Sequence, residues 1–206
     1  MSKKFKNLLL LIYLAAFTSL VIGASFAYFT ALQVSKVSSK VNVTTAVTDS
    51  LLFDSGFPIN IAPTIENFGE GMGNLSGETF ASAYLQVDGD QEIAYKYNLY
   101  LELEKNTLTY STVAKSPELL LTITDPDGNM VTNVENLEFT KSKDVEGFDI
   151  TTKTGRYYIA KDYVIKSSTK AFQKWVAKVT YVNLDASQNG NFEKELKGYI
   201  RIEKAE

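Results

Sequence analysis

The chain has 206 residues, of which 45% are hydrophobic and 22% are charged, and its formal net charge is −3. These fractions are close to globular averages, and the length suits about one ordinary domain with a packed core. The sequence contains no cysteine and no histidine. This excludes a disulfide-stapled scaffold and removes the commonest general base and the commonest zinc ligand.

Residues 1–27 have the pattern of a secretory signal peptide with a hydrophobic helix. Three lysines lie within the first six residues, and no charged side chain follows until after residue 35. A bilayer accepts the apolar helix and retains the cationic end inside. Signal peptidase needs small side chains one and three residues before the cut, so Ser25 and Ala27 predict cleavage before Tyr28. An uncleaved membrane anchor is the alternative, because the run is long enough to span roughly 30 Å of hydrocarbon.

The end of this segment carries a resemblance to a known family. Residues 23–30 read Gly-Ala-Ser-Phe-Ala-Tyr-Phe-Thr, a small-residue turn followed by Ala-Tyr-Phe-Thr. This resembles the SipW-type signal peptide of the TasA/camelysin class, which are surface proteins of Gram-positive bacteria processed by a dedicated signal peptidase. The resemblance implies secretion to the cell surface or the extracellular space, with signal peptidase as a partner. Camelysin has been described as a metalloprotease, but this chain has no His-Glu-x-x-His, so that activity is not carried over.

The predicted mature chain, residues 28–206, is acidic. Without the three lysines of the signal it has 18 basic and 24 acidic residues, a net charge of −6. Nucleic acid is therefore an unsuitable partner, because phosphates demand a basic face. Membrane contact is expected only through the N-terminal segment.

Residues 28–40 are expected to form an arm that leads into a β-strand. Val41, Val43 and Val47 alternate on one face of that strand, which is rich in β-branched residues. In TasA-like fibres such an arm completes the sheet of the next subunit, so the resemblance marks these valines as a candidate subunit-contact strand. Insertion into the protein's own domain is the alternative. Residues 53–77 follow, with two prolines and five glycines, and predict a long loop with a short strand at 59–61.

The rest of the chain alternates apolar and polar residues with turn residues between the runs, and no segment after Leu32 has a helical period. The predicted strands are 80–87, 93–104, 119–124, 148–152, 157–165 with a bulge at Lys161-Asp162, 172–183 and 196–202. In the clearest of them, Tyr97, Leu99 and Leu101 share the apolar face. Seven to nine such strands predict an all-β fold, an antiparallel β-sandwich of immunoglobulin-like or jelly-roll type. The aromatic penultimate strand and the final Gly-x-Ile-x-Ile strand also resemble the TasA/camelysin class.

No stretch of the sequence predicts catalytic, cofactor or metal chemistry. Asp125-Pro-Asp-Gly-Asn129 could begin a calcium loop, but Gly and Glu are not at the required positions, and a hairpin turn explains the same residues. The favoured function is a non-enzymatic secreted cell-surface or biofilm-matrix protein that forms fibres through its N-terminal strand. The alternatives are a monomeric surface module that binds a glycan or another surface protein, and an exported hydrolase.

Overall fold

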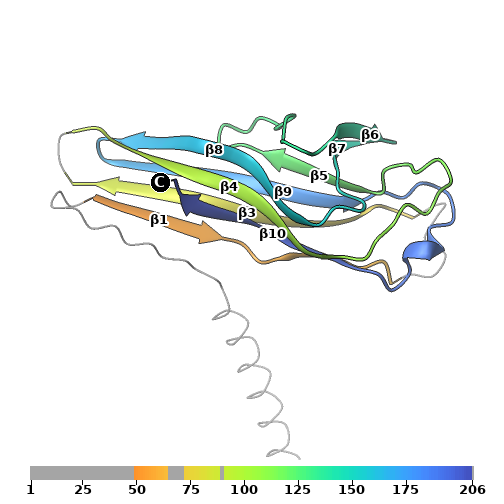
Figure 1. Ribbon diagram of the computed structural model, residues 1–206. Helices are drawn as coiled ribbons and strands as arrows, with labels where there is room; N and C mark the ends of the chain where they lie inside the picture. Colours follow the sequence, from red (N-terminus) through yellow and green to blue (C-terminus); the bar gives the residue numbers. More distant parts are fainter. Residues whose placement is uncertain (1–48, 65–71, 89–90, 206) are drawn as a thin grey trace, which may run out of the picture. The chain divides into compact units, whose positions relative to one another are not determined.

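The computed structural model describes residues 49–64, 72–88 and 91–205, which all belong to one compact unit. These residues form ten β-strands in two sheets and one short 3-10 turn, η1 (Asn189–Asn191) (Figure 1). The six-stranded sheet has the order β1-β3-β9-β5-β7-β6 and contains β1 (Asp49–Ser55), β3 (Leu75–Val87), β5 (Leu119–Thr124), β6 (Phe139–Ser142), β7 (Val145–Asp149) and β9 (Lys170–Tyr181). The four-stranded sheet has the order β2-β10-β4-β8 and contains β2 (Ile59–Ile61), β4 (Ile93–Asn106), β8 (Gly155–Ser167) and β10 (Leu196–Lys204). All pairings between these strands are antiparallel, so the predicted all-β antiparallel class is confirmed.

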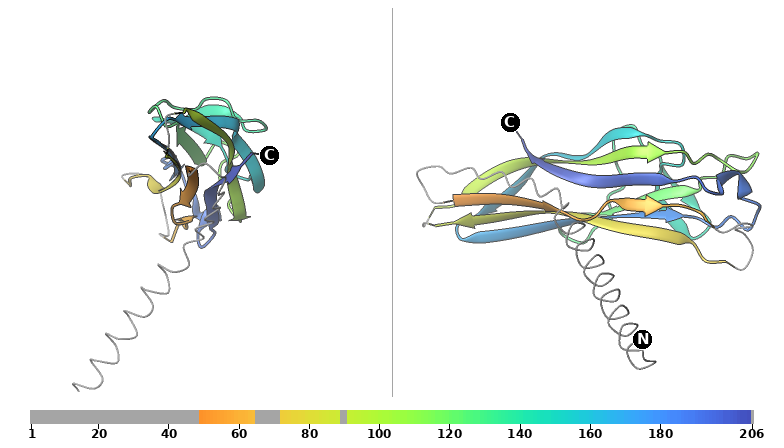
Figure 2. Two further views of the ribbon diagram at one scale, coloured as in Figure 1. Left: turned by 90° about the vertical axis from the view of Figure 1, so that its left-hand side faces the viewer. Right: turned by 90° about the horizontal axis from the view of Figure 1, so that it is seen from below.

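The strands pair in a nested order along the chain. β2 pairs with β10, β3 with β9, β4 with β8, and β5 with β7. The pairs β2–β10 and β4–β8 lie in the four-stranded sheet, and the pairs β3–β9 and β5–β7 lie in the six-stranded sheet. The right-hand view of Figure 2 shows β10 and β4 in one layer and β3 and β9 in the other.

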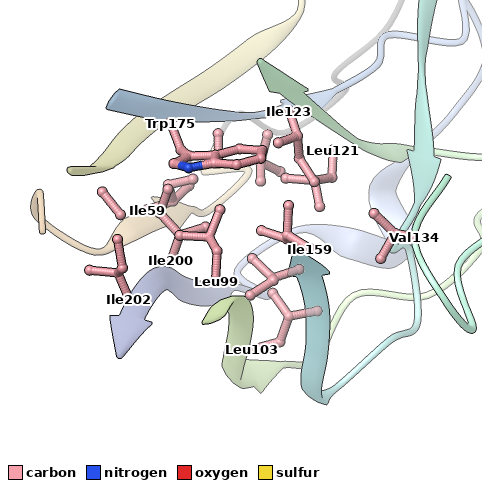
Figure 3. Packing of buried hydrophobic residues seen from close by; sticks show 14 of the residues in the cluster. Ile59, Leu99, Leu103, Leu121, Ile123, Val134, Ile159, Trp175, Ile200 and Ile202 are labelled. Carbon is pink, nitrogen blue, oxygen red and sulfur yellow. The ribbon is translucent and has the colours of Figure 1, made fainter. Parts of the chain in front are cut away.

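The inner faces of the two sheets form one hydrophobic core. Figure 3 shows Trp175 and Ile123 of the six-stranded sheet facing Leu99 and Ile200 of the four-stranded sheet. Leu99 is 0% exposed and Trp175 is 3% exposed, so the burial expected from alternation is confirmed. Removing a side chain of this size from water contributes about 1.5–3 kcal/mol.

Polar atoms inside this core are paired across the sheets. The indole N–H of Trp175 donates a hydrogen bond of 2.9 Å to the hydroxyl of Tyr97, which itself donates to Oε1 of Gln173 at 2.8 Å. Buried aromatic side chains with polar atoms are stable only when those atoms find partners. These two bonds link β4 to β9 and fix the position of one sheet relative to the other.

The predicted loop over residues 53–77 is wrong at both ends, because β1 extends to Ser55 and β3 begins at Leu75. The expected short strand within it is confirmed as β2. Gly77 falls within this predicted loop but lies inside β3, where a Cβ atom would come within 2.9 Å of Ile59 Cγ2. A glycine in a strand commonly marks such a close approach.

The predicted strand over residues 148–152 is also displaced. The strand is β7, and its chain leaves the sheet after Asp149, where the N–H of Lys153 donates to the carbonyl of Ile150 in a turn. Strand β6 is not among the strands predicted from the sequence. It pairs with β7 through a turn at Lys143, a residue with φ of 53°.

The predicted bulge in β8 is confirmed. Tyr97 pairs with Tyr163 and Leu99 with Ala160, so two residues of β8 lie opposite Asn98 alone. The second of them, Asp162, has φ of 52°, and its N–H donates to Oδ1 of Asn98 at 3.0 Å. This bond satisfies the backbone group that the bulge removes from the ladder.

Candidate functional site

The predicted signal-peptidase residues Ser25, Ala27 and Tyr28 lie outside the described residues. The same holds for Val41, Val43 and Val47, the candidate subunit-contact strand. Their roles stay predictions. The described residues do show which sheet edges such a strand could join.

An open edge lies along the second half of β10. Strand β2 pairs only with Leu196–Gly198 of β10. The remaining residues, Tyr199–Lys204, pair with β4 on one side. On the other side they pair with no strand among the residues that the structure describes. Unpaired backbone groups at a sheet edge are a template for another strand.

The start of β1 lies at one end of this open edge. The hydroxyl of Tyr95 donates a hydrogen bond to Oδ2 of Asp49, the first residue of β1, and Asp49 is buried. The Nζ atom of Lys204, the last residue of β10, lies 5.0 Å from the centre of the same tyrosine ring. Asp49, the first described residue of β1, therefore lies at the end of the open edge where β10 finishes.

The two prolines of the segment explain why β2 is short enough to leave β10 open. Pro58 directly precedes β2, and Pro63 follows it after one residue. Proline has no N–H to donate to a ladder, so it confines a strand to a few residues at a sheet edge. This is the sequence signal from which the open edge could have been found.

The outer face beside the open edge carries tyrosine and arginine side chains from three strands. The guanidinium of Arg156 lies 4.0 Å from the centre of the Tyr100 ring, and that of Arg201 lies 4.3 Å from the Tyr199 ring. Glu102 is between them, 3.1 Å from Nε of Arg201 and 3.8 Å from Nη2 of Arg156. The Arg201 contact is an ion pair without an aligned hydrogen bond, since its buried Nε has no hydrogen-bond partner among the described residues.

Local contacts shift the pKa values on this face. Burial raises the pKa of Tyr100, and nearby Glu203 adds to the effect. The hydrogen bond from Lys197 lowers the pKa of Glu104, whose carboxylate also accepts from Tyr199 at 3.1 Å. The hydrogen bond to Tyr199 raises the pKa of Arg201. All three shifts move the pKa further from 7, so Tyr100 stays neutral and Glu104 and Arg201 stay charged at neutral pH.

The other edge of the four-stranded sheet, β8, is blunted. Its bulge breaks the row of backbone groups, and Lys161 in the bulge pairs with Glu135 at 3.2 Å. Charged residues and bulges at an edge oppose strand addition. A shallow groove of about 370 Å³ lies here, lined by Asn133, Glu135, Tyr158, Ile159, Ala160 and Lys161.

Glu118 has a buried carboxylate, 0% exposed, and is the described residue that most resembles a catalytic acid or base. Its oxygens accept hydrogen bonds from the N–H and hydroxyl of Ser111, from Tyr181 at 3.1 Å, from Gln188 at 2.9 Å and from Asn191 at 3.0 Å. Every donor is neutral and comes from the loops at one end of the sandwich or from the end of β9. The carboxylate is fully engaged in fastening these loops and has no contact with solvent.

The calcium alternative receives no support from the geometry of residues 125–129. Oδ1 of Asp125 accepts from the N–H groups of Asp127 at 3.0 Å and Asn129 at 2.8 Å, which is the pattern of a tight turn. No group of three or more acidic side chains among the described residues is placed to hold a metal ion. In the same part of the chain, no helix is long and apolar enough to cross a bilayer.

The fold and its edges define a class of protein: an antiparallel two-sheet β domain in which β10 has an open edge near the start of β1. Comparison with protein-family models finds no family that matches the chain, and comparison with curated proteins finds no matching relative.

Proposed function

We propose that this protein is a non-enzymatic structural component of the cell surface or biofilm matrix of a Gram-positive bacterium. It is exported by its N-terminal signal, and it polymerises when residues 41–47 of one subunit pair with the open edge of β10 in the next. The observation that carries this proposal is the open edge over Tyr199–Lys204, which ends near Asp49, the first described residue of β1. β-strand addition to such an edge is a general mode of protein association.

The lengths and faces of the two segments agree. The open edge has six residues, 199–204, and the valine-bearing part of the predicted strand, from Val41 to Val47, has seven. Ile200 and Ile202 of β10 are buried against the core. A strand beside them with Val41, Val43 and Val47 on its inner face would extend the same apolar layer.

Insertion of residues 41–47 into the open edge of the same chain is the alternative to exchange between subunits. Asp49 lies at the end of this edge through its contact with Tyr95, whose ring also lies against Lys204. The same chain and a neighbouring chain could therefore both supply the strand, and a cross-linking experiment separates the two arrangements.

The nested pairing of the strands supports the jelly-roll alternative over the immunoglobulin-like one. A jelly roll pairs early strands with late strands in two packed sheets. The pairs β2–β10, β3–β9, β4–β8 and β5–β7 follow that rule. We therefore propose a jelly roll in which β6 extends one sheet.

The tyrosines on the outer face of the four-stranded sheet do not support the glycan-binding alternative. Tyr100 is 4% exposed. Guanidinium groups cover the Tyr100 and Tyr199 rings, and the Lys161 ammonium lies 4.7 Å from the centre of the Tyr158 ring. A sugar stacks on an open ring face, which these residues do not present.

Engineered cysteines test the proposal, because the natural chain has none. Thr44→Cys combined with Arg201→Cys or Glu203→Cys places thiols on the outward faces of the two segments. Neighbouring strands bring Cα atoms within the 4.4–6.8 Å that a disulfide bridges. We expect a ladder of covalent oligomers on non-reducing gels of the released protein, whose N-terminus is established from its intact mass.

The matched control is Thr44→Cys with Lys161→Cys, which places the second thiol on the blunted edge β8 and should give no ladder. Internal disulfides within single chains would show insertion into the protein's own domain. The absence of any cross-link to β10, or a product that still contains residues 1–27, would contradict the proposal.

A further inference from the structure

The outer face of the six-stranded sheet carries a partly exposed apolar cluster. Leu52 of β1, Tyr84 of β3 and Phe172 of β9 are direct neighbours in one cross-strand row. Phe172 is 63% exposed, which is a large fraction for a phenylalanine in a paired strand. Two rows further along, Phe80 and Val176 form a second apolar pair.

A charged row lies between the two apolar rows. It consists of Asp54 on β1, Ser82 on β3 and Lys174 on β9. Asp54 and Lys174 therefore lie on opposite sides of the central strand β3, with the small Ser82 side chain between them. Neither makes an ion pair with another of the described residues.

We propose that this face pairs with the same face of a second copy, about a two-fold axis that runs along β3. That rotation places β9 of one copy over β1 of the other, so Lys174 faces Asp54 of the second copy and Asp54 faces its Lys174. Phe172 is placed over Leu52 in both directions, and the tyrosines at position 84 meet at the axis. A two-fold interface requires this kind of self-complementary patch.

The charges also exclude the other two-fold arrangement of the face. A two-fold axis that lies in the plane of the interface, perpendicular to the strands and through the charged row, would place Asp54 on Asp54 and Lys174 on Lys174. Opposed like charges act against an interface and are a common means of specificity. Aligned packing of two sheets at about −30° then brings the charged row and the two apolar rows together at the centre.

This surface is distinct from the open edge of β10, which belongs to the other sheet. The inference therefore goes beyond the proposed polymer and does not depend on it. In a matrix, it would join protomers side by side, whereas strand addition would join them in sequence.

A charge-swap cycle tests the pairing. The purified protein is followed by sedimentation velocity at concentrations below those at which larger species appear. We expect Asp54→Lys and Lys174→Asp each to raise the dissociation constant of the dimer about tenfold or more, because each creates two like-charge contacts. The double variant Asp54→Lys/Lys174→Asp restores both ion pairs in reverse, and its dissociation constant should return to within about threefold of the natural value.

Phe172→Asp tests the apolar row and should raise the same constant about a hundredfold, as for a central aromatic contact. The residue is exposed, so the midpoint of urea unfolding should not change. Val113→Asp, with the same charge change at an exposed apolar residue of a distant loop, is the matched control and should leave the dimer intact.

The inference would be overturned if the dimer of the double variant dissociated as readily as that of either single variant. It would also be overturned if the natural protein stayed monomeric over the whole concentration range. A natural monomer in which Phe172→Asp speeds proteolysis within residues 28–48 would show that the N-terminal segment of the same chain covers this face, and would also overturn it.

Discussion

At the scale of single residues, Glu118 shows how a buried charge can be kept without a cation. Five neutral donors converge on its two oxygens, and a charged carboxylate accepts all of them. An amide in its place would turn an NH₂ group toward these donors and leave at least one of them unpaired.

Glu118→Gln is therefore expected to lower the free energy of unfolding by about 1–3 kcal/mol, although the two side chains have the same shape. Urea unfolding at neutral pH measures this loss. Glu203→Gln is the control, since Glu203 is partly exposed on the outer face and the change should stay within about 0.5 kcal/mol. Equal losses for the two variants would show that the buried cluster does not depend on the charge.

At the scale of elements, Gly147 allows β7 to lie against β5. A Cβ atom at this position would come within 2.7 Å of the carbonyl oxygen of Leu121, which is fixed backbone in the centre of the sheet. We expect Gly147→Ala to cost about 1–3 kcal/mol in urea unfolding, because β7 must shift from a strand with which it shares only two paired residues.

Gly73→Ala is the matched control, because nothing lies within 4 Å of a Cβ atom there, and its change should be within about 0.5 kcal/mol. If Gly147→Ala were equally harmless, the approach of β7 to β5 would not be as close as the structure shows.

Strands with strong alternation could be predicted from the sequence, and weakly patterned ones could not. β4, β5, β9 and β10 agree with their predicted ranges within a few residues, because β4, β9 and β10 bury side chains at alternate positions and β5 is a short apolar run. The first half of β3 was missed, since its inner face uses Gly77 and Thr79 where β2 approaches closely. Local residue types favour a loop there, and only contact with a distant strand decides otherwise.

The open edge of β10 could not be predicted from the sequence either, because it depends on pairing between segments that are far apart in the chain. Sequence alternation indicated that residues 196–202 form a strand, but not that β2 covers only three of its residues. Single-sequence patterns define faces, whereas partners are set by packing between segments far apart in the chain. The prolines on either side of β2 were the one local signal.

At the scale of the whole molecule, the buried tyrosines predict loss of stability at alkaline pH. Burial raises the pKa of Tyr97 and of Tyr181 above the ordinary value of 10.0, and burial with the hydrogen bond to Asp149 raises the pKa of Tyr110 to about 12. A raised pKa in the folded state stabilises the protein fully below the unfolded value, and this contribution is lost as pH rises through the folded value.

The midpoint of urea unfolding should therefore be constant up to a pH of about 9 and fall between about 10 and 12. Tyrosinate absorbance should rise together with the loss of structure. Tyr110→Phe should make the decline less steep over this range. A midpoint that does not change up to pH 12 would contradict the prediction.

The place of the last strand has a consequence for how the chain acquires its structure. β10 lies between β2 and β4, inside its sheet, although it is the final element of the sequence. The nested pairs give the fold a high contact order, and long-range β pairing is slow to form. A chain that emerges N-terminus first cannot complete the four-stranded sheet until residues 196–204 are free. While these residues are still held in the ribosome or in a translocation pore, β2 and β4 lack the strand between them, and the sheet closes in a late step.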